Sequence, residues 1–477
     1  MTHASTLDTD VCIIGGGPAG LVVARELVAR GREVVLLESG AEEPDDGADA
    51  LNDGDVVGDR YAGLRVTRRR QVGGAMQSWN TLVRGAPGAK WVPLDPVDVD
   101  GRWPFDHATL RPYYERAQTL CGLGPYAYDA ASWARPETGR APVQLEGHGL
   151  VSRVYQLGAR QALLGPTLQR LRESGNATLL TRATVTRLET EAWRVRHAVV
   201  ASPDGVRRRV RARCFVLAAG AVENARLLLA SGDGTGLGDT SGLVGRGFME
   251  HPRDTAITLF PPPGAYGDLG FYDAHVVDGT TILGRLALDA DTVRAHDLPN
   301  ASGTLLPRIR QWGARWLREA GGHGWSRRRA PRLAYDGFTV LLNVEQRPHA
   351  DNRVVLGRRV DTHGAALPEL HWRWHTEEHA RLVRLRAVVA RGLASLGRVR
   401  VRDDASPDPN AHHHAGTTRM HEDPREGVVD AHGRVHAVEN LYVAGASVFP
   451  TAGFANPTLT IVALALRLAD HLAAGER

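Results

Sequence analysis

A glycine-rich turn near the start of the chain constrains the fold more than any other feature of the sequence. Residues 15–20 read GGGPAG and follow an apolar run at residues 10–14. We predict a strand over that run, a helix over 21–29, and a second strand over 34–37 that ends at Glu38. A strand, glycine turn, helix and strand in this order predict a Rossmann-like unit that binds a dinucleotide.

The individual positions in this unit have distinct physical roles. Gly15 permits the tight turn, Gly17 lets the backbone approach a pyrophosphate, and Gly20 lets the helix pack close to the strand. The N-terminus of the helix then faces the phosphate charge. Glu38 follows the last glycine at close to the spacing of about 20 residues at which an acidic side chain binds the ribose.

Length and composition set further bounds. At 477 residues the chain exceeds the roughly 250–300 residues of a single hydrophobic core, so we expect two domains. Its 58 basic and 54 acidic residues give a net charge of only +4, which does not indicate a nucleic-acid partner. Lys90 is the only lysine, and this arginine bias is typical of a GC-rich bacterial genome.

Cysteine usage and hydropathy exclude other classes. Cys12, Cys121 and Cys214 are far apart and form no CxxC motif, which excludes a disulfide scaffold and a cysteine-based zinc site. The N-terminus is polar, and no apolar run approaches the roughly 20 residues needed to cross a bilayer. We therefore expect a cytoplasmic protein with no membrane partner.

Later segments extend the first unit. A second strand–glycine–helix unit is predicted over 214–230, and a third over 440–472, where Asn456 suits the cap of a helix opening with Pro457. Short alternating runs between them indicate antiparallel strands, with helical stretches at residues 311–320 and 377–396. The pattern predicts an α/β fold, in which a Rossmann-like cofactor-binding domain is interleaved with an α+β substrate-binding domain built on an antiparallel sheet. The predicted ranges are 1–95, 151–252 and 405–477 for the cofactor-binding domain, and 96–150 and 253–404 for the substrate-binding domain.

Two polar stretches receive structural interpretations. Residues 45–59 are acidic and glycine-rich, so we expect a flexible surface excursion. The run Arg68-Arg69-Arg70 is interpreted as a solvated or loop-anchoring stretch rather than a nucleic-acid patch.

Three adjacent histidines, His412, His413 and His414, are candidates for chemistry. Adjacent side chains of an extended segment point to alternate sides, and no acid or cysteine lies nearby at ligand spacing, so no metal site is predicted. Histidine titrates near neutral pH, which favours a general base as the functional interpretation. The alternative is a solvated histidine run.

Five blocks of sequence, taken together, resemble one known family. The blocks are residues 15–20 with Glu38; Gly73-Gly74 to Trp79; 217–229 (LAAGAVENARLLL); 245–252 (GRGFMEHP); and the pair 412–420 (HHHAGTTRM) and 440–460 (NLYVAGASVFPTAGFANPTLT). Their order and spacing resemble the glucose-methanol-choline (GMC) family of FAD-dependent oxidoreductases over nearly the whole chain. Residues 440–460 are most similar to the pyranose oxidase branch and related bacterial sugar oxidoreductases.

The resemblance implies roles for particular residues. In such enzymes a histidine three residues before a glycine is the catalytic base, which here is His413 before Gly416. A second polar residue follows about forty residues later, and here it is Asn456, as in the His–Asn version of pyranose and cholesterol oxidases. His251 is interpreted as structural or cofactor-adjacent, and Arg419 as anchoring its loop or contacting substrate. The residues expected to bind FAD are Gly15, Gly17, Pro18, Ala19, Gly20, Glu38, Ser39, Gly73, Gly74, Ser78, Trp79, Asn80, Val185, Ala219, Gly220, Gly445, Ala446, Asn456, Pro457 and Thr458.

One departure from the family pattern concerns the cofactor linkage. Some pyranose oxidases attach FAD covalently through a histidine just before the tryptophan of the glycine loop. The matching residue here is Ser78, which precedes Trp79. Serine cannot form a histidyl link, so noncovalent FAD is expected.

The expected activity is FAD-dependent oxidation of a hydroxyl group on a sugar-like substrate: a pyranose, a glycoside or an aminoglycoside intermediate of antibiotic biosynthesis. A polycationic aminoglycoside needs acidic side chains near the flavin, and Glu250 and Asp254 are candidates. Alternatives are an oxidase of a non-sugar alcohol or sterol, an amine oxidase or hydroxylase on a related fold, and an inactive flavin-binding protein. The resemblance leaves the electron acceptor, oxygen or another molecule, and the oligomeric state open.

Overall fold

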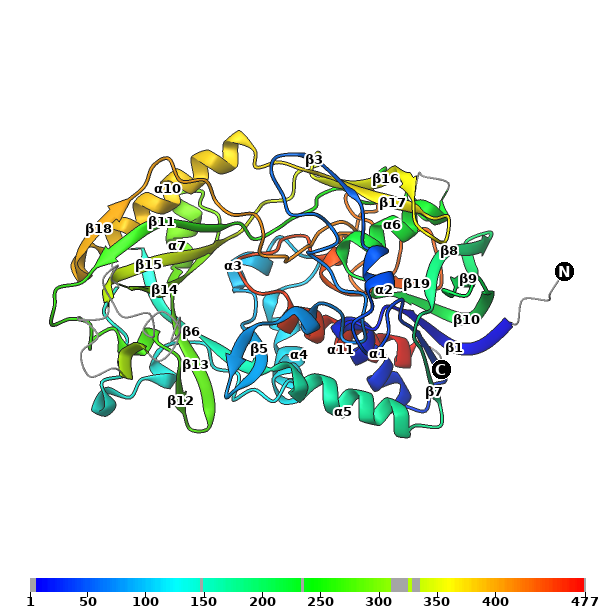
Figure 1. Ribbon diagram of the computed structural model, residues 1–477, viewed down its shortest axis with the longest axis horizontal. Coiled ribbons are helices and arrows are strands. Elements are labelled where there is room, and N and C mark those ends of the chain that lie inside the picture. The colour runs from blue at the N-terminus through cyan, green and yellow to red at the C-terminus, as the bar shows by residue number, and fades with distance from the viewer. Residues whose placement is uncertain (1–5, 146–148, 233–235, 310–324, 328–334, 476–477) are drawn as a thin grey trace.

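The computed structural model describes residues 6–145, 149–232, 236–309, 325–327 and 335–475. These residues form three sheets, of seven, nine and three strands. Figure 1 shows the seven-stranded and nine-stranded sheets in two lobes side by side along the long axis of the molecule. The helix predicted over 311–320 lies outside the described residues.

The seven-stranded sheet carries the glycine turn, and the predicted Rossmann-like unit is confirmed. Strand β1 pairs in parallel with both β2 and β10, and β10 pairs in parallel with β19. Strand β2 (VVLL) is buried at every position, as expected for a parallel strand covered on both faces. The strands, in spatial order with β19 last, are β7 (Ala177–Leu180), β2 (Val34–Leu37), β1 (Thr6–Ile14), β10 (Arg207–Leu217), β9 (Arg194–Ala201), β8 (Thr184–Glu191) and β19 (Leu441–Val443).

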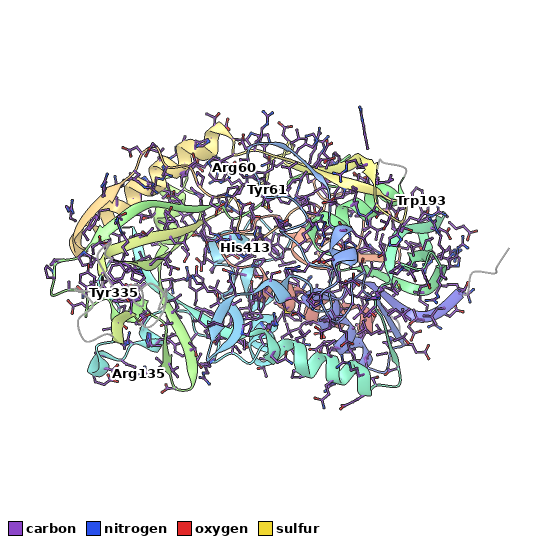
Figure 2. The ribbon with its side chains drawn as sticks, in the orientation of Figure 1. Arg60, Tyr61, Arg135, Trp193, Tyr335 and His413 are labelled. Carbon is purple, nitrogen blue, oxygen red and sulfur yellow. The ribbon has the colours of Figure 1, made fainter. Side chains whose placement is uncertain are left out.

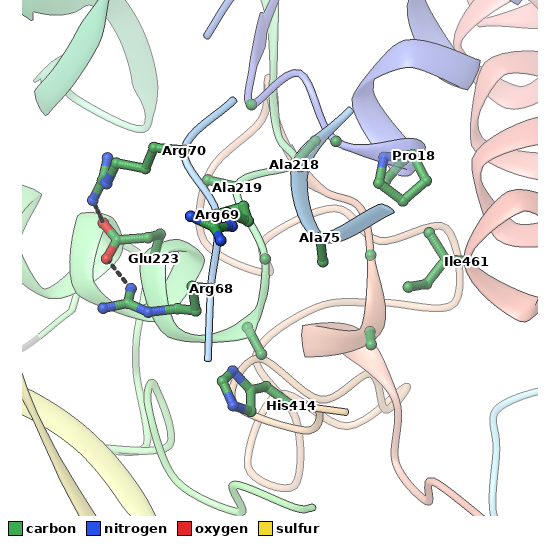
Figure 3. A pocket seen from close by; sticks show the side chains of 18 of the residues that line it. Pro18, Arg68, Arg69, Arg70, Ala75, Ala218, Ala219, Glu223, His414 and Ile461 are labelled. Atoms are coloured by element: carbon green, nitrogen blue, oxygen red, sulfur yellow. Dashed lines mark hydrogen bonds and ion pairs between the residues drawn. The ribbon is translucent and has the colours of Figure 1, made fainter. Parts of the chain in front are cut away.

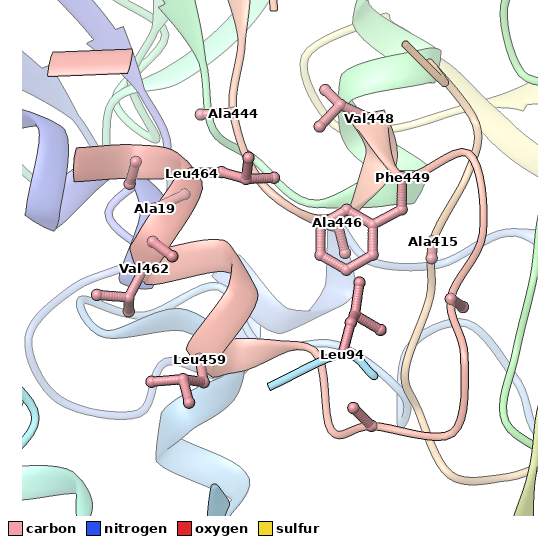
Figure 4. Packing of buried hydrophobic residues seen from close by; sticks show 14 of the residues in the cluster. Ala19, Leu94, Ala415, Ala444, Ala446, Val448, Phe449, Leu459, Val462 and Leu464 are labelled. Carbon is pink, nitrogen blue, oxygen red and sulfur yellow. The ribbon is translucent and has the colours of Figure 1, made fainter. Parts of the chain in front are cut away.

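Helices from both ends of the chain pack together beside this sheet. The first helix, α1, contacts the last helix, α11. Ala19 of α1 and Leu459, Val462 and Leu464 of α11 are buried in one apolar cluster, with Phe449 beside them (Figure 4). The two chain ends therefore build one half of the molecule. The helices of this lobe are α1 (Pro18–Val28), α5 (Arg160–Glu173), α6 (Ala221–Ser231) and α11 (Thr458–Ala474).

The nine-stranded sheet is antiparallel, as predicted for the second domain. Its strands are β18 (Arg398–Val401), β11 (Arg253–Phe260), β15 (Tyr335–Val344), β14 (Ala301–Ile309), β13 (Thr280–Leu288), β6 (Leu150–Ala159), β5 (Ala86–Trp91) and β4 (Thr81–Val83), with β12 (His275–Val277) paired to β13. Apart from the helices named above and a short helix within residues 45–59, the described α-helices are α3 (Pro96–Val99), α4 (His107–Leu120), α7 (Ala290–Ala295) and α10 (Thr376–Leu393).

Three strands from the ranges predicted for the cofactor-binding domain pair in the nine-stranded sheet. They are β4, β5 and all of β6 except Leu150. Short strands of ordinary alternation do not specify which distant strand they pair with, so the sequence pattern could not assign them to a sheet.

The expectation of a flexible excursion at residues 45–59 is wrong. Asp45 caps a short helix by accepting hydrogen bonds from the Gly47 and Ala48 N–H groups. Farther along, Arg359 pairs with Asp53 and with Asp55 at 3.1 and 2.9 Å. The acidic residues are thus hydrogen-bonded or ion-paired rather than disordered. The elements involved are α2 (Asp46–Ala50) and the three-stranded sheet of β16 (Arg353–Val360), β17 (Ala366–Trp372) and β3 (Asp55–Gly58).

Among the described helices, none combines the length and apolar character needed to span a membrane.

Candidate active site

A cavity of about 1490 Å³, counting the open space at its mouth, joins the glycine turn at residues 15–19 to the histidine segment at residues 412–414. Figure 3 shows its wall beside the start of α1 and the loop that carries Arg68 to Ala75. The predicted residues that line it are Gly15, Gly17, Pro18, Ala19, Glu38, Ser39, Gly74, Trp79, Val185, Ala219, Gly220, His413, Gly445, Ala446, Asn456, Pro457 and Thr458.

Four predicted cofactor residues lie outside this lining. Gly20 serves packing, because an added Cβ would lie 2.0 Å from the Gly15 carbonyl oxygen. Gly73 has a φ of +96° and donates its N–H to the Gly16 carbonyl, so it shapes the loop that crosses the turn. The side chains of Ser78 and Asn80 are exposed, and Ser78 accepts a hydrogen bond from Arg69.

Three lining glycines leave room for a ligand. An added Cβ at Gly17 or Gly445 would have no protein atom nearer than 4.0 Å, and one at Gly220 would have none within 4 Å. Gly17 precedes α1 and Gly220 precedes α6, and neither helix has a side-chain cap. The free N–H groups of two helix N-termini therefore border open space, which suits the pyrophosphate of FAD.

Glu38 fastens the glycine turn from the second strand. Its two carboxylate oxygens accept hydrogen bonds from the Gly16 and Gly40 N–H groups, at 2.8 and 2.7 Å. Burial raises the pKa of this carboxyl, while the two N–H groups and the nearby Arg70 act in the opposite direction. Each oxygen keeps a second lone pair for a ribose hydroxyl, so the residue fits both the structural role and the predicted binding role.

The arginine run anchors its loop, which is one of the two predicted alternatives, because Arg68 donates to the Asn52 carbonyl and Arg70 to the Leu51 carbonyl. Arg68 and Arg70 are half-buried and both pair with Glu223 of α6, as Figure 3 shows; the Arg70 contact is 2.9 Å. Arg226 also pairs with Glu223, at 2.7 Å. Three guanidinium groups around one carboxylate leave a positive wall along the cavity, and they hold the pKa of Glu223 far below its usual range against burial, which raises it.

The histidine segment contributes a hydrogen-bonded pair. His413 Nδ1 lies 2.9 Å from His251 Nδ1, and His251 Nε2 lies 3.3 Å from the Ala452 carbonyl oxygen. A carbonyl oxygen can only accept, so His251 carries its proton on Nε2 and accepts on Nδ1. His413 must then donate from Nδ1, which leaves the Nε2 lone pair of His413 free to accept a proton.

Both rings are held in the neutral form. Burial lowers the pKa of His251 to about 4. The pKa of His413 is also lowered well below 6.5, first by burial and then by the neighbouring His251 and Arg253. In Figure 2 His413 is labelled near the middle of the molecule, between the two lobes.

Asn456 does not cap the last helix. That helix begins at Thr458 with Pro457 as its cap residue, and no side chain caps it. Asn456 instead places Nδ2 at 3.3 Å from His413 Nε2. Its Oδ1 is buried with no hydrogen-bond partner among the described residues. A buried acceptor without a partner beside the basic nitrogen of His413 indicates a place that a ligand completes.

Glu250 ties the two histidine segments together. Its Oε1 accepts hydrogen bonds from the backbone N–H groups of His413 and His251, at 2.7 and 2.9 Å. Its Oε2 accepts from the Tyr61 hydroxyl at 2.7 Å, and that hydroxyl lies 2.8 Å from His414 Nε2. Burial raises the pKa of Glu250 to about 7.

The fold does bring an acid to the histidine run. Ligand atoms of Glu250, His412 and His414 lie within 4.8 Å of one another, a group that the sequence spacing did not indicate. Because the Tyr61 hydroxyl already bridges Glu250 and His414, two of the three side chains are used in a hydrogen-bond network.

Several residues of the site were not predicted from the sequence, and the role of Arg419 was left between two alternatives. Glu223 and Arg226 line the cavity without having been predicted, although both lie inside the recognised 217–229 block. The direct contact of His251 with His413 had no local signal, since the residues are far apart in the chain. Arg419 donates to the Glu426 carbonyl at 2.9 Å, which is the loop-anchoring alternative.

Comparison with known proteins gives consistent matches. The sequence pattern described as FAD dependent oxidoreductase matches residues 10–364, and that described as GMC oxidoreductase matches residues 348–465. Paromamine 6'-oxidase of Streptomyces fradiae is 30% identical over 97% of this chain and 91% of its own. The 6'''-hydroxyparomomycin C oxidase of Streptomyces lividus is 29% identical over 98% and 92%. The crystal structure of pyridoxine 4-oxidase from Mesorbium loti shares the fold, with a TM-score of 0.61, 21% identity, and coverage of 97% and 99%.

Proposed function

The chain belongs to the GMC family of FAD-dependent oxidoreductases, and on that premise we propose that it oxidises a hydroxyl group of a sugar-like substrate with His413 as the base. The observation that carries the assignment of the base is the hydrogen-bond chain from Ala452 through His251 to His413. This chain fixes the proton on His413 Nδ1 and leaves Nε2 as the basic atom. A general base must be neutral before it reacts, and the lowered pKa of His413 meets that condition at neutral pH.

FAD, when bound, supplies the acceptor for the hydride that leaves the carbinol carbon of the substrate. An alcohol is a poor hydride donor until its hydroxyl proton begins to leave. His413 Nε2 takes that proton. His251 fixes the orientation of the His413 ring through Nδ1, and Glu250 holds the His413 backbone N–H. The residues that would hold FAD are the glycine turn with Glu38, the Gly74–Trp79 loop, and the uncapped starts of α1 and α6.

Asn456 orients the substrate in this proposal. Its Nδ2 already donates toward His413 Nε2, so the amide and the base converge on one point. A substrate hydroxyl at that point can accept from the Asn456 amide while it donates to His413. The orphaned Oδ1 is available for a second polar contact with substrate or cofactor.

Replacement of Asn456 by alanine is expected to slow flavin reduction about 10²-fold, the usual cost of one positioned donor near the reacting oxygen. The rate is measured by anaerobic stopped-flow absorbance of the bound flavin. Gln169→Ala, which removes an amide from an exposed position on α5, should leave the rate unchanged. An unaltered rate in Asn456→Ala would contradict the orienting role.

The substrate class rests on the sugar-oxidising relatives. Two relatives that align over nearly the whole chain carry the names of aminoglycoside oxidases, and aminoglycosides are built from sugar rings. We infer that a pyranose, a glycoside or an aminoglycoside intermediate is the substrate. The test is anaerobic bleaching of the bound flavin by a panel of these compounds, with simple alcohols and a sterol as comparison and admission of air as the last step. Bleaching by a non-sugar alcohol in preference to every sugar would overturn the inference.

We propose that FAD is held without a covalent bond. Ser78 lies on the exposed side of its loop, and no cysteine or tyrosine is among the described lining residues. Acid precipitation of the holoenzyme should therefore release all of the yellow colour into the supernatant. Flavin absorbance that stays with the precipitated polypeptide would point to a link through His412, His413 or His414, the histidines that line the cavity.

A further inference from the structure

One face of the nine-stranded sheet is polar and lies against the reactive segments. Tyr155 and Arg285 both contact the Ser302 hydroxyl, at 2.8 and 3.3 Å, which places these side chains on the same face. The register pairs Ser302 with Asn343, and Asn343 with Arg253. The same face reaches both halves of the proposed catalytic pair: Arg253 Nη2 donates at 2.6 Å to the carbonyl oxygen of Asn410, three residues before His413, and Arg285 stacks at 4.3 Å on the ring of Phe454, two residues before Asn456.

Lys90 lies on this face and differs in residue type from every other basic residue of the chain. It is the only lysine, whereas every other basic side chain among the 58 is arginine. Its Nζ donates to the Thr304 hydroxyl at 3.1 Å and lies 5.1 Å from the centre of the Tyr155 ring. Burial, and after it the positive charge of Arg253, lower the pKa of Lys90 to about 8. No acidic group opposes these two causes.

Arg253 is the second cation of the face. Its positive charge lowers the pKa of Lys90, of His412 and of His413, in each case after the larger effect of burial, so the guanidinium is near all three groups. Within the described chain, the polar contacts of Arg253 and Lys90 are a carbonyl and a hydroxyl, and neither cation has a carboxylate at ion-pair distance. Arg253 also interacts electrostatically with Glu250, whose oxygens already accept hydrogen bonds from the protein. Two like charges in a partly buried site repel each other, and an anion that joins them relieves this repulsion.

The acidic side chains nearby are already paired. Asp254 is buried and pairs with Arg386 at 2.7 Å, and buried Glu345 pairs with Arg102 at 3.1 Å. Glu250 accepts three hydrogen bonds from groups of the protein. Glu250 and Asp254 were the two candidate acids for binding a polycationic substrate. Both already have partners within the protein. Asp95, beside Arg285, pairs with that arginine at 3.7 Å. Lys90 and Arg253 have no carboxylate at ion-pair distance among the described residues.

We propose that Lys90 and Arg253 form an oxyanion subsite, so that the sugar-like substrate carries a carboxylate or a phosphate group. This inference rests on the proposed function, because it places the subsite beside the hydroxyl that His413 deprotonates. The ammonium of Lys90 and the guanidinium of Arg253 converge on the oxyanion, and each forms a charge-assisted hydrogen bond. A polyamine substrate would be repelled by the same pair. The subsite thus sets the orientation of the sugar as well as its class.

The test is direct binding of four probes, measured by calorimetry under anaerobic conditions on holoenzyme whose flavin has been reduced, so that no hydride can be accepted. Glucose 1-phosphate carries its oxyanion on C1 and glucuronate carries its oxyanion on C5. Methyl glucoside is the neutral reference and glucosamine the cationic one. At least one acidic probe should bind about tenfold or more tightly than methyl glucoside, the usual value of a hydrogen bond to a charged group. The acidic probe that prevails distinguishes a phosphate from a carboxylate.

Variants assign the effect to Lys90. K90Q should remove the preference by weakening the acidic probe about tenfold while methyl glucoside binds as before, and K90R, which keeps the charge, should retain most of it. R111Q removes one positive charge from an exposed position on α4 and should change neither affinity. Circular dichroism and flavin content verify that each variant is folded and loaded; R253Q replaces K90Q if that variant does not fold.

Three outcomes would overturn the subsite: both acidic probes binding no tighter than methyl glucoside, glucosamine binding tighter than either acid, or K90Q weakening all probes equally. Because binding is measured without turnover, the result separates from that of the proposed function. Bleaching of the flavin by sugars without Lys90-dependent binding would refute the subsite alone. Lys90-dependent binding without bleaching by any sugar would refute the proposed oxidation and leave the subsite standing.

Discussion

Replacement of His413 by alanine is expected to slow reduction of the bound flavin by about 10²- to 10⁴-fold, the range that a positioned general base contributes. The variant loses the only ring nitrogen whose lone pair converges with the Asn456 amide among the described residues. FAD binding should persist, because the glycine turn and Glu38 are untouched. The rate comes from anaerobic stopped-flow absorbance, and the cofactor content from the ratio of flavin to protein absorbance.

Two further histidine variants bracket this result. His296 is exposed on the far lobe, so His296→Ala should reduce flavin at the wild-type rate. His414 is hydrogen-bonded to Tyr61, and His414→Ala should have a smaller effect than His413→Ala. Near-normal reduction by His413→Ala, with His414→Ala inactive, would transfer the role of base to His414.

Replacement of Gly17 by valine is expected to abolish stable retention of FAD without unfolding the protein. A Cβ added at Gly17 would have no protein atom nearer than the Ala218 carbonyl oxygen at 4.0 Å, so the side chain begins in the space assigned to the cofactor. Forcing a branched side chain into occupied space costs about 1–3 kcal/mol, or roughly 10- to 100-fold in affinity. The dissociation constant is measured by titrating FAD into the apoprotein and following flavin fluorescence.

A matched control separates this effect from loss of glycine in general. Gly175 is exposed, has an ordinary backbone conformation, and also has no atom within 4 Å of an added Cβ. Gly175→Val should therefore bind FAD like the wild type. Full flavin content in Gly17→Val would show that the cofactor does not pass beside the start of α1.

The parts of the site that the sequence predicted are those with short-range signals. The turn at Gly15 to Gly20 and the acid at Glu38 are fixed by spacing within one βαβ unit, and the fold reproduces them. The pairing of His413 with Asn456 followed from a resemblance to a family, since nothing in the local sequence joins residues so far apart. The structure brings these two side chains to 3.3 Å.

What the sequence could not predict depends on distant partners. Residues 45–59 have the composition of a flexible loop, yet the pairing of β3 with β17 and the contact of Asp53 with Arg359 give them a defined structure. His251 carried no signal for its contact with His413, because a lone histidine in an apolar block specifies no partner. The expected cap at Asn456 failed because Pro457 itself occupies the cap position.

The central claim is that this chain removes a hydride from the carbon bearing a sugar hydroxyl and delivers it to FAD. The most direct measurement is the rate of anaerobic flavin bleaching by a pyranose, compared with the same pyranose deuterated at the carbon that becomes the carbonyl. Bleaching should be slower with the deuterated compound and should yield one carbonyl product per flavin. Bleaching at the same rate for both compounds and without a carbonyl product, or no bleaching by any sugar, would contradict it.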